Sequence, residues 1–508
     1  MKFKLNFSFA FFVFAICYLS ILIGFIILNL PNTPIRWDEA AHLDNGLFLK
    51  LGMFNSFSKN LFYPPLYDVL TFLSYSLFGV SVVSARIVDA FFSVLLLWVV
   101  FEFTDKAYDG KTALLASVFL GLMPGYFAVS HVVMLETIMI FFFTLSILFF
   151  YLWIQTNKSK MLIFTAITLI LGFFAKYQVV VAILVMFIAV LILSRSRLTK
   201  PFSKKSYVAI ILVLLATVAY LIISLHSYIE MWLNVIAMSN TDSQTIIPTF
   251  YLTETQSIYS TIHPISLFTY ILGFVGFGVF AIRRQKPDKL FLIWFITVFV
   301  FYTLIPNKNW RYVIPFYPVL AISAAVFVTV AYSKLRSRKE ILAKISALIL
   351  IAFTCLSLIQ SVNDNIAWIN FENISFPLEQ AVDYVITHDS PNQSITVLCP
   401  NNLLSQGIIQ FYLLKDGGPQ IRLYSYPWST IIDPTFNITT LISRCKQYDV
   451  KFLFTTDYGG NNVSWFNSTL TLMDIYAQLY NSGNFTQITP EQTFCQSPRS
   501  IYILNFTG

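Results

Sequence analysis

The sequence predicts a polytopic α-helical membrane protein with a soluble α/β domain at its C-terminal end. Of its 508 residues, 57% are hydrophobic and only 11% are charged, whereas a soluble protein carries roughly 25% charged residues. Long apolar runs separated by short basic segments fill residues 1–360, and short amphipathic pieces alternate over residues 361–508. We therefore expect a transmembrane domain over 1–360 and a separate domain over 361–508.

The charge pattern predicts the orientation in the membrane. The net charge is +8, and most Lys and Arg residues cluster in short segments between apolar runs. This is the positive-inside pattern of cytoplasmic loops, and it argues against nucleic acid as a partner. Residues 361–508 carry seven Asn-X-Ser/Thr triplets, which accept glycans on the extracytoplasmic side. Their asparagines are Asn373, Asn392, Asn437, Asn462, Asn467, Asn484 and Asn505.

The apolar runs predict eleven spans, with the N-terminus in the cytoplasm and the C-terminal domain outside. The first run is too long for a cleavable leader and is expected to remain as a span. The stretch 61–82 contains Pro64, Pro65 and Asp68, and is predicted to be a helix lying in the interface. The eleven spans are 7–30, 86–104, 111–128, 136–154, 160–176, 177–194, 206–226, 264–282, 289–305, 312–332 and 340–360.

A short acidic stretch directly follows the first span, in the predicted external loop 31–85. It holds Asp38, Glu39, His42 and Asp44, and Arg86 follows at the end of the loop. Adjacent carboxylates at a membrane surface raise each other's pKa, which makes them costly neighbours unless they are used. The alternatives are a catalytic loop and a solvated loop that merely ends a helix.

Further ionisable residues gather on the same predicted face. Glu136 opens one span, Lys176 ends another, and Arg311 lies in a late external turn. A second external loop is predicted over 227–263. Ionisable groups at such positions cost about 2.5–3.5 kcal/mol at depth and are functional candidates. A carboxylate can deprotonate a nucleophile while cations hold an anionic leaving group, which favours transfer from a lipid phosphate carrier.

The order of these features resembles the GT-C membrane glycosyltransferases over about residues 6–335. The features are Trp37-Asp38-Glu39-Ala40-Ala41-His42 after the first span, Tyr63-Pro64-Pro65-Leu66, Gly79, Arg86, Tyr108-Asp109-Gly110-Lys111, Glu136, Ala175-Lys176-Tyr177 and Arg311-Tyr312-x-x-Pro315-x-x-Pro318. The nearest relatives are the dolichyl-phosphate-mannose protein mannosyltransferases and the lipid A aminoarabinose transferases.

The resemblance implies roles for individual residues. Asp38 corresponds to the catalytic base, and Glu136 to a second acidic residue that orients a substrate. The family usually has Asp preceded by Arg there, where this chain has Glu136 and His131. Arg311 and then Lys176 are expected to bind the lipid phosphate, and Arg86 to shape the loop. The catalytic set is Asp38, Glu39 and Glu136. The substrate-binding set is Arg311, Lys176, Arg86, Tyr312, His42 and Tyr63.

The expected reaction moves a sugar from a polyprenyl (dolichyl) phosphate to an acceptor hydroxyl on the extracytoplasmic face, with inversion. The acceptor is a protein, a glycan or a lipid, and no cofactor or divalent metal is expected. An oligosaccharyltransferase is the nearest alternative, although Phe454-Thr455-Thr456-Asp457 lacks the tryptophans of its acceptor motif. A lipid-linked sugar flippase or transporter is the alternative from another class, against which stands the lack of an internal repeat. The triplets favour an archaeal cell membrane, with the endoplasmic reticulum as the alternative.

Several of these residues also have alternative interpretations that involve no role in sugar transfer. Asp38 and His42, four residues apart, could bind a metal if they lie on a helix. Lys176 could simply extend its side chain to the membrane interface. Arg311 could be an interfacial anchor beside Trp310, and Glu136 could cap the N-terminus of its helix.

The C-terminal domain is predicted to alternate helices and strands. Its helices are expected at 377–388, 403–415, 437–447 and 470–481, and its strands at 394–399, 420–425, 450–455, 484–488 and 500–506. This alternation favours a small α/β sheet domain that recognises the acceptor or covers the membrane domain. Cys399, Cys445 and Cys495 allow one disulfide, whose pairing the sequence does not determine.

Overall fold

The structure is a computed structural model. It describes residues 6–29, 35, 37–61, 63–193, 211, 215, 218, 263–304, 310–372, 378–388, 394–398, 406–416, 422–426, 437–456, 472–487, 494–496 and 499–507. The predicted span 206–226, apart from three residues, and the predicted loop 227–263, apart from His263, lie outside the described residues. Asp38 is described in its backbone alone.

The chain divides into two compact units. The first unit comprises Met1–Ile27, Leu61–Tyr67 and Arg86–Phe371. The second comprises Leu28–Asn60, Asp68–Ala85 and Glu372–Gly508. The predicted first external loop thus contributes most of its residues to the same unit as the C-terminal domain.

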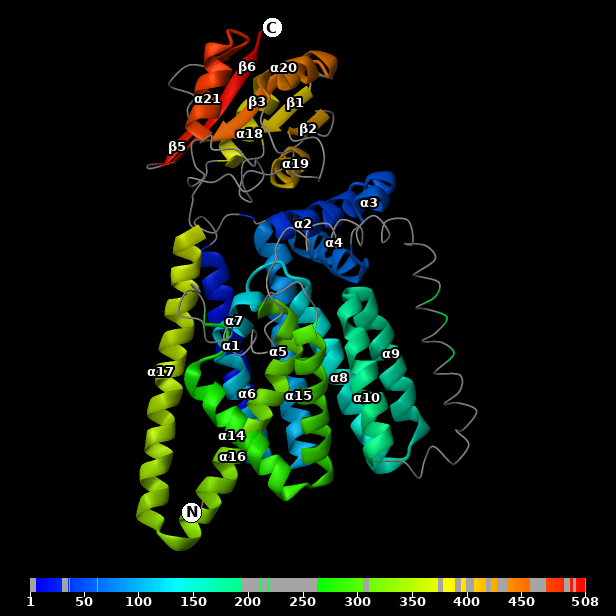
Figure 1. Ribbon diagram of the computed structural model, residues 1–508, viewed down its shortest axis with the longest axis vertical. Coiled ribbons are helices and arrows are strands. Elements are labelled where there is room, and N and C mark those ends of the chain that lie inside the picture. The colour runs from blue at the N-terminus through cyan, green and yellow to red at the C-terminus, as the bar shows by residue number, and fades with distance from the viewer. Residues whose placement is uncertain are drawn as a thin grey trace. The chain divides into compact units, whose positions relative to one another are not determined.

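The first unit is built from helices, and α8, α9 and α10 lie side by side in it (Figure 1). Within the described ranges its helices are α1 (Phe7–Asn29), α5 (Val82–Ala107), α6 (Gly110–Gly121), α7 (Pro124–Ser130), α8 (Leu135–Thr156), α9 (Ser159–Ala175), η2 (Tyr177–Val179), α10 (Val180–Leu193), α14 (Leu267–Arg283), α15 (Lys286–Leu304), η3 (Trp310–Phe316), α16 (Tyr317–Arg338) and α17 (Glu340–Glu372).

Every predicted span within the described ranges corresponds to a helix, which confirms a polytopic helical protein. By length and composition, six helices among the described residues can cross a membrane, or seven if α6 and α7 count as one. The total of eleven crossings stays a prediction. The expected span 111–128 consists of two helices, α6 and α7, with a bend of 72° between them, because Pro124 has no N–H to continue the first helix and instead opens the second.

Two glycines let α14 and α16 approach closely. A Cβ on Gly276 would lie 2.1 Å from the carbonyl oxygen of Ser323, and one on Gly273 would lie 2.2 Å from Leu320. The two glycines are three residues apart and therefore share one helix face. Ser323 Oγ also donates a hydrogen bond of 2.9 Å to the Gly273 carbonyl. Small residues of this kind replace hydrophobic burial as the means of helix packing in membranes.

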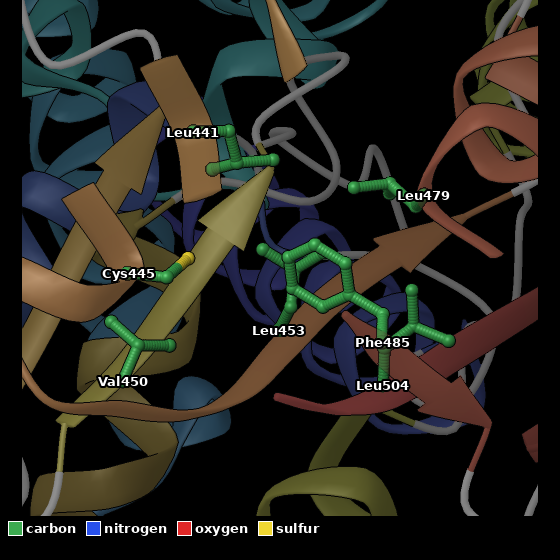
Figure 2. Close-up of a cluster of buried hydrophobic side chains, with 7 residues drawn as sticks. All are labelled: Leu441, Cys445, Val450, Leu453, Leu479, Phe485 and Leu504. Carbon is green, nitrogen blue, oxygen red and sulfur yellow. The ribbon is translucent and has the colours of Figure 1, made fainter. Parts of the chain in front are cut away.

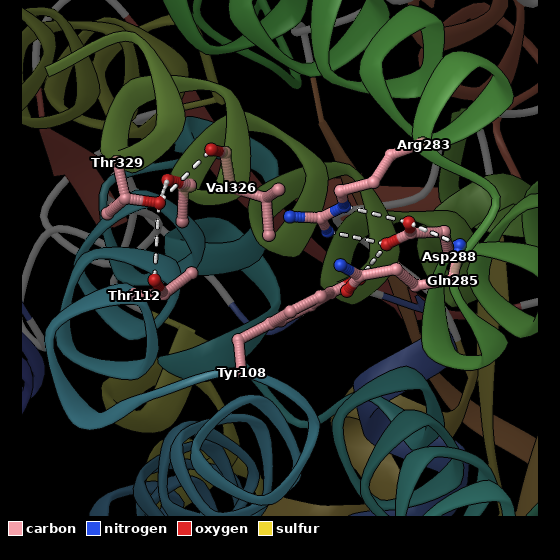
Figure 3. A network of polar contacts seen from close by, with 8 residues as sticks. Tyr108, Thr112, Arg283, Gln285, Asp288, Val326 and Thr329 are labelled. Atoms are coloured by element: carbon pink, nitrogen blue, oxygen red, sulfur yellow. Dashed lines mark hydrogen bonds and ion pairs between the residues drawn. The ribbon is translucent and has the colours of Figure 1, made fainter. Parts of the chain in front are cut away.

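A buried polar network ties several of these helices together (Figure 3). Asp288, which is fully buried, accepts from Tyr108 Oη at 2.6 Å and from Arg283 Nη2 at 2.6 Å. Nearby, Thr112 Oγ1 donates to Thr329 Oγ1 at 3.2 Å, which links α6 to α16. The turn after α5 is thereby fixed to the turn between α14 and α15.

The N-terminal part of the second unit consists of α2 (Trp37–Lys50), α3 (Phe54–Asn60) and α4 (Leu66–Phe78). The predicted interfacial stretch 61–82 therefore contains a helix of 13 residues. Gly46 of α2 faces α4, where a Cβ would lie 2.6 Å from Thr71 Cγ2. The missing side chain lets the two helices come into contact.

The C-terminal part of the second unit alternates helices and strands in the expected order. Its sheet has the order β2-β1-β3-β6-β4, with β5 paired to β6; β1 is parallel to β2 and β3, and β6 is antiparallel to its partners. The elements are α18 (Leu378–His388), β1 (Ser394–Leu398), α19 (Gln406–Lys415), β2 (Arg422–Tyr426), α20 (Ile438–Gln447), β3 (Val450–Thr456), α21 (Leu472–Asn481), β4 (Phe485–Gln487), β5 (Phe494–Gln496) and β6 (Arg499–Phe506). The short strand β5 was not expected.

A hydrophobic cluster joins α20 and α21 to β3, β4 and β6 (Figure 2). Its buried members are Leu441, Cys445, Val450, Leu453, Leu479, Phe485 and Leu504. Cys445 is a free thiol here, and burial raises its pKa to about 12. It therefore acts as a small apolar core residue.

Candidate active site

The acidic stretch forms the start of helix α2. Asp38 is the second residue of this helix and Glu39 the third. Carboxylates in a first turn are favoured by the helix dipole, and Ala40 and Ala41 are strong helix formers. The Glu39 side chain is fully buried, with 0% of its surface exposed. The alternative of a solvated loop is therefore wrong for this residue and for most of the helix that follows.

His42 contacts a carboxylate that lies far away in the sequence. Its Nδ1 lies 2.7 Å from Oδ1 of Asp68 on α4. Asn45 Nδ2 donates to the other oxygen, Oδ2, at 3.0 Å, and Asn60 Nδ2 donates to Asn45 Oδ1 at 2.9 Å. His42, Asn45 and Asp68 are all buried. The predicted role of His42 in binding substrate stays a prediction, and its Nδ1 is directed to Asp68.

Asp44 is a second buried carboxyl group on α2. Its Oδ1 has no hydrogen-bond partner among the described residues. Burial raises the pKa of Asp44 well above its ordinary value. Helix α19 packs on this side of α2: a Cβ on Gly407 would lie 3.3 Å from Ala40 Cβ and 3.5 Å from Asp44 Oδ2. Helix α2 is therefore covered by α4 on one side and by α19 on another.

In the first unit, three predicted residues come together. Lys176 Nζ lies 2.9 Å from Glu136 Oε1, and Arg311 Nη1 lies 4.0 Å from the same oxygen. The side chains of Lys176 and Glu136 are 5% and 2% exposed, whereas that of Arg311 is 24% exposed. One carboxylate between two cations leaves the cluster with a net positive charge, and Arg311 is its most solvent-exposed member. Such a cluster can hold an anionic group.

The local backbone explains how these side chains are presented. Glu136 lies in the first turn of α8, where a carboxylate is favoured. Lys176 is extended between α9 and η2, with φ −158° and ψ 130°. Arg311 lies in the short η3 helix that precedes α16. Glu136 and Arg311 thus lie at the starts of two helices, and Lys176 lies in the break between two others.

Aromatic and sulfur groups border the cluster. Lys176 Nζ lies 5.6 Å from the ring centroid of Tyr63, which stacks on Tyr177 with 6.0 Å between centroids. A cation over a ring face is attracted to it. Arg311 Nη1 lies 3.2 Å from Met134 Sδ. Tyr312, the other predicted substrate-binding tyrosine, is half-buried beside Arg311.

Arg86 is buried in α5 with 1% of its surface exposed. One turn further along α5, Asp89 is also buried and accepts a hydrogen bond from the hydroxyl of Tyr67. The backbone N–H of Met134 lies 3.4 Å from the same carboxylate. Sequence reasoning missed Asp89 and Tyr67, although a carboxylate inside a predicted span is the signal for such a site.

Part of the chain matches a known protein family. Residues 63–223 match the family model described as dolichyl-phosphate-mannose-protein mannosyltransferase. Comparison with curated protein sequences finds no match.

Three solved structures share the fold. ArnT from Cupriavidus metallidurans in the apo state is similar with a TM-score of 0.58 and 12% identity, over 98% of this chain and 99% of that one. The same protein bound to undecaprenyl phosphate gives 0.54 and 13%, over 96% and 98%. The archaeal oligosaccharyltransferase AglB from Archaeoglobus fulgidus, in complex with an inhibitory peptide and a dolichol-phosphate, gives 0.52 and 12%, over 87% and 69%. The chain thus has the GT-C fold of these membrane enzymes.

Proposed function

We propose that this protein is a glycosyltransferase that takes a sugar from a polyprenyl phosphate and transfers it to an acceptor hydroxyl. The observation that carries the proposal is the cluster of Glu136, Lys176 and Arg311, with its net positive charge, in a GT-C fold. Structural neighbours bind undecaprenyl phosphate and a dolichol-phosphate. The family match names a dolichyl-phosphate sugar as donor.

Each residue of the cluster has a proposed role. Arg311 is the more exposed cation and binds the phosphate of the donor, since its planar guanidinium can form two parallel hydrogen bonds to phosphate oxygens. Lys176 adds a second positive charge, and Glu136 holds the lysine in place. Tyr63 covers Lys176 with its ring. These charges stabilise the phosphate as it leaves.

Other predicted residues take the remaining roles. Asp38 is the proposed base, and Glu39 shapes the electrostatics around it. Arg86 supports the loop, while Tyr312 and His42 are proposed to contact the sugar or the acceptor.

The proposed reaction is a direct displacement. Asp38 takes the proton of the acceptor hydroxyl, and the hydroxyl oxygen forms a bond to the anomeric carbon of the sugar. The bond from that carbon to the phosphate oxygen breaks, and polyprenyl phosphate leaves with the bonding electrons. One displacement inverts the anomeric centre. No step requires a cofactor.

An oligosaccharyltransferase is the second candidate, because one structural neighbour carries that activity. Its acceptor would be an asparagine amide rather than a hydroxyl. Residues 454–457, Phe-Thr-Thr-Asp, lack the tryptophans expected of its acceptor motif. We therefore rank it below hydroxyl transfer.

The test uses purified protein in nanodiscs with radiolabelled dolichyl-phosphate mannose and a solubilised membrane extract as acceptor. Formation of labelled product together with release of dolichyl phosphate supports the proposal. A positioned base contributes roughly 10²–10⁴-fold, so D38N should lose nearly all turnover while inserting normally into membranes. Release of no dolichyl or undecaprenyl phosphate from any of a panel of sugar donors would refute the proposal. Activity of D38N above a few per cent of wild type would instead show that another group is the base.

A further inference from the structure

The two oxygens of Asp68 hold two residues of helix α2 at once. His42 Nδ1 lies 2.7 Å from Oδ1, and Asn45 Nδ2 donates to Oδ2 at 3.0 Å. His42 and Asn45 are three residues apart on α2 and therefore share one face of that helix. Asn60, at the end of α3, donates to Asn45 and completes the network. The network joins all three helices of the loop.

This arrangement is costly unless it is used. Asp68 is fully buried, and burial raises its pKa, although the neighbouring His42 opposes the shift. A well-packed apolar contact between α2 and α4 would be a cheaper way to join the helices. What the polar network adds is a unique geometry. Rotation of α2 about its axis, or a slip along it, breaks both hydrogen bonds to Asp68.

The proposed base lies close to this network along the helix. Asp38 is four residues before His42, a little over one turn of α2. Because a helical turn is stiff, a shift of His42 moves the backbone of Asp38 by a similar amount. Misplacing a reacting group by about 1 Å can cost roughly 10²-fold in rate.

We infer that Asp68 is a positioning residue for the transfer reaction, which sets the place of Asp38 through its bonds to His42 and Asn45. The inference rests on the proposed function. It assigns a role to a residue that the sequence marked only as a charge interrupting an apolar stretch.

The test exchanges the side chains of residues 45 and 68. The carboxylate of Asp68 can only accept, so the N–H at His42 Nδ1 is the donor in the wild type. With that N–H still donating to the amide oxygen in D68N, the amide NH₂ of residue 68 faces that of Asn45, and the hydrogen bond between residues 45 and 68 is lost. The double variant N45D/D68N restores it: the new amide at 68 accepts from His42 and donates to the carboxylate at 45, which still accepts from Asn60. All three hydrogen bonds are kept.

The expected result is a difference between the single and the double variant. D68N should lower kcat for dolichyl-phosphate mannose by roughly 10- to 100-fold with little change in KM, since the base acts in the chemical step. N45D/D68N should recover kcat to within about fivefold of wild type, since the misplacement is undone. If D68N does not accumulate as folded protein, the kcat of N45D/D68N alone tests the inference, against the expected value within about fivefold of wild type.

Lys50 provides the matched control. Its Nζ donates to the Tyr75 carbonyl at 2.7 Å, so it also joins α2 to α4, but at the far end of α2 from Asp38. K50A should lower the stability of the helix pair and leave kcat near that of wild type.

Two results would overturn the inference. One is a D68N enzyme whose kcat falls no more than that of K50A. The other is a folded N45D/D68N enzyme whose kcat stays low. Failure of the proposed function is distinguishable, because wild type would then transfer no sugar from any donor.

Discussion

The buried pair of Glu136 and Lys176 offers a quantitative test of the candidate site. The two charged atoms are 2.9 Å apart, and the side chains are 2% and 5% exposed. At this distance and an effective dielectric constant of about 20, their attraction is about 6 kcal/mol. Desolvation offsets much of it, but removing one partner leaves an unpaired buried charge, which costs about 3–5 kcal/mol. E136Q and K176M should therefore each destabilise the protein.

The surroundings predict that the two losses differ. In K176M, Glu136 keeps the cation of Arg311 at 4.0 Å, so the cost should lie near the lower limit of about 3 kcal/mol. In E136Q, Lys176 keeps the ring of Tyr63 at 5.6 Å, so the cost should approach about 5 kcal/mol. The double variant E136Q/K176M removes both charges and should be more stable than either single variant.

The assay is the free energy of unfolding from SDS titration in mixed micelles, combined with the KM for dolichyl-phosphate mannose. The double variant should recover stability but keep a raised KM, because the proposed phosphate ligand Lys176 is absent. Additive losses of stability in the double variant would refute the ion pair. Recovery of both stability and KM in the double variant would support the ion pair but show that Lys176 has a purely structural role and does not bind the phosphate.

Two further predictions concern other parts of the molecule. Burial raises the pKa of Asp44 in the folded state, so the folded protein binds a proton more tightly than the unfolded chain does, and stability falls as pH rises above the ordinary aspartate range. D44N should therefore be more stable than wild type at pH 8 and gain less at pH 4 in thermal unfolding; a larger gain at pH 4 would contradict this. In α14, G276V should prevent monodisperse folding in size-exclusion chromatography, because a Cβ there would lie 2.1 Å from the Ser323 carbonyl oxygen. G278V should behave like wild type, because a Cβ at that position would meet no other side chain and no neighbouring helix within 4 Å.

The positions of the membrane helices followed from the sequence because bilayer thickness imposes a length on each apolar run. Helix ends were less accurate. Helix α17 continues to Glu372, past the expected end at 360, because apolarity decides where a helix enters the membrane and not where its hydrogen bonds stop. The bend at Pro124 was missed for a related reason: the run is apolar on both sides of the proline, so its hydropathy shows no break.

The cationic cluster was predictable because each member is an ionisable residue in apolar surroundings. Glu136, Lys176 and Arg311 stand out singly, and the structure brings both cations within 4.0 Å of the same Glu136 oxygen. Asp89 met the same criterion, but its partner Tyr67 carries no charge and gave no signal. No sequence rule joins Asp68 to His42, because the two lie 26 residues apart on helices whose contact depends on tertiary packing.

Helix α2 shows where local sequence rules and the fold disagree. Its sequence reads as a polar external segment, yet Glu39, His42, Asp44 and Asn45 are all buried. A core helix of this size would ordinarily carry apolar residues, which cost nothing to desolvate. Burying four polar side chains on one helix lowers the stability of the folded protein. Such departures from the rule that buried residues are apolar are expected at functional sites. We infer that α2 is polar because a fixed position of this helix matters more for the reaction than the stability that apolar side chains would add. The same helix carries Asp38, the proposed base. A carboxylate that must lie within hydrogen-bond distance of a hydroxyl tolerates little movement.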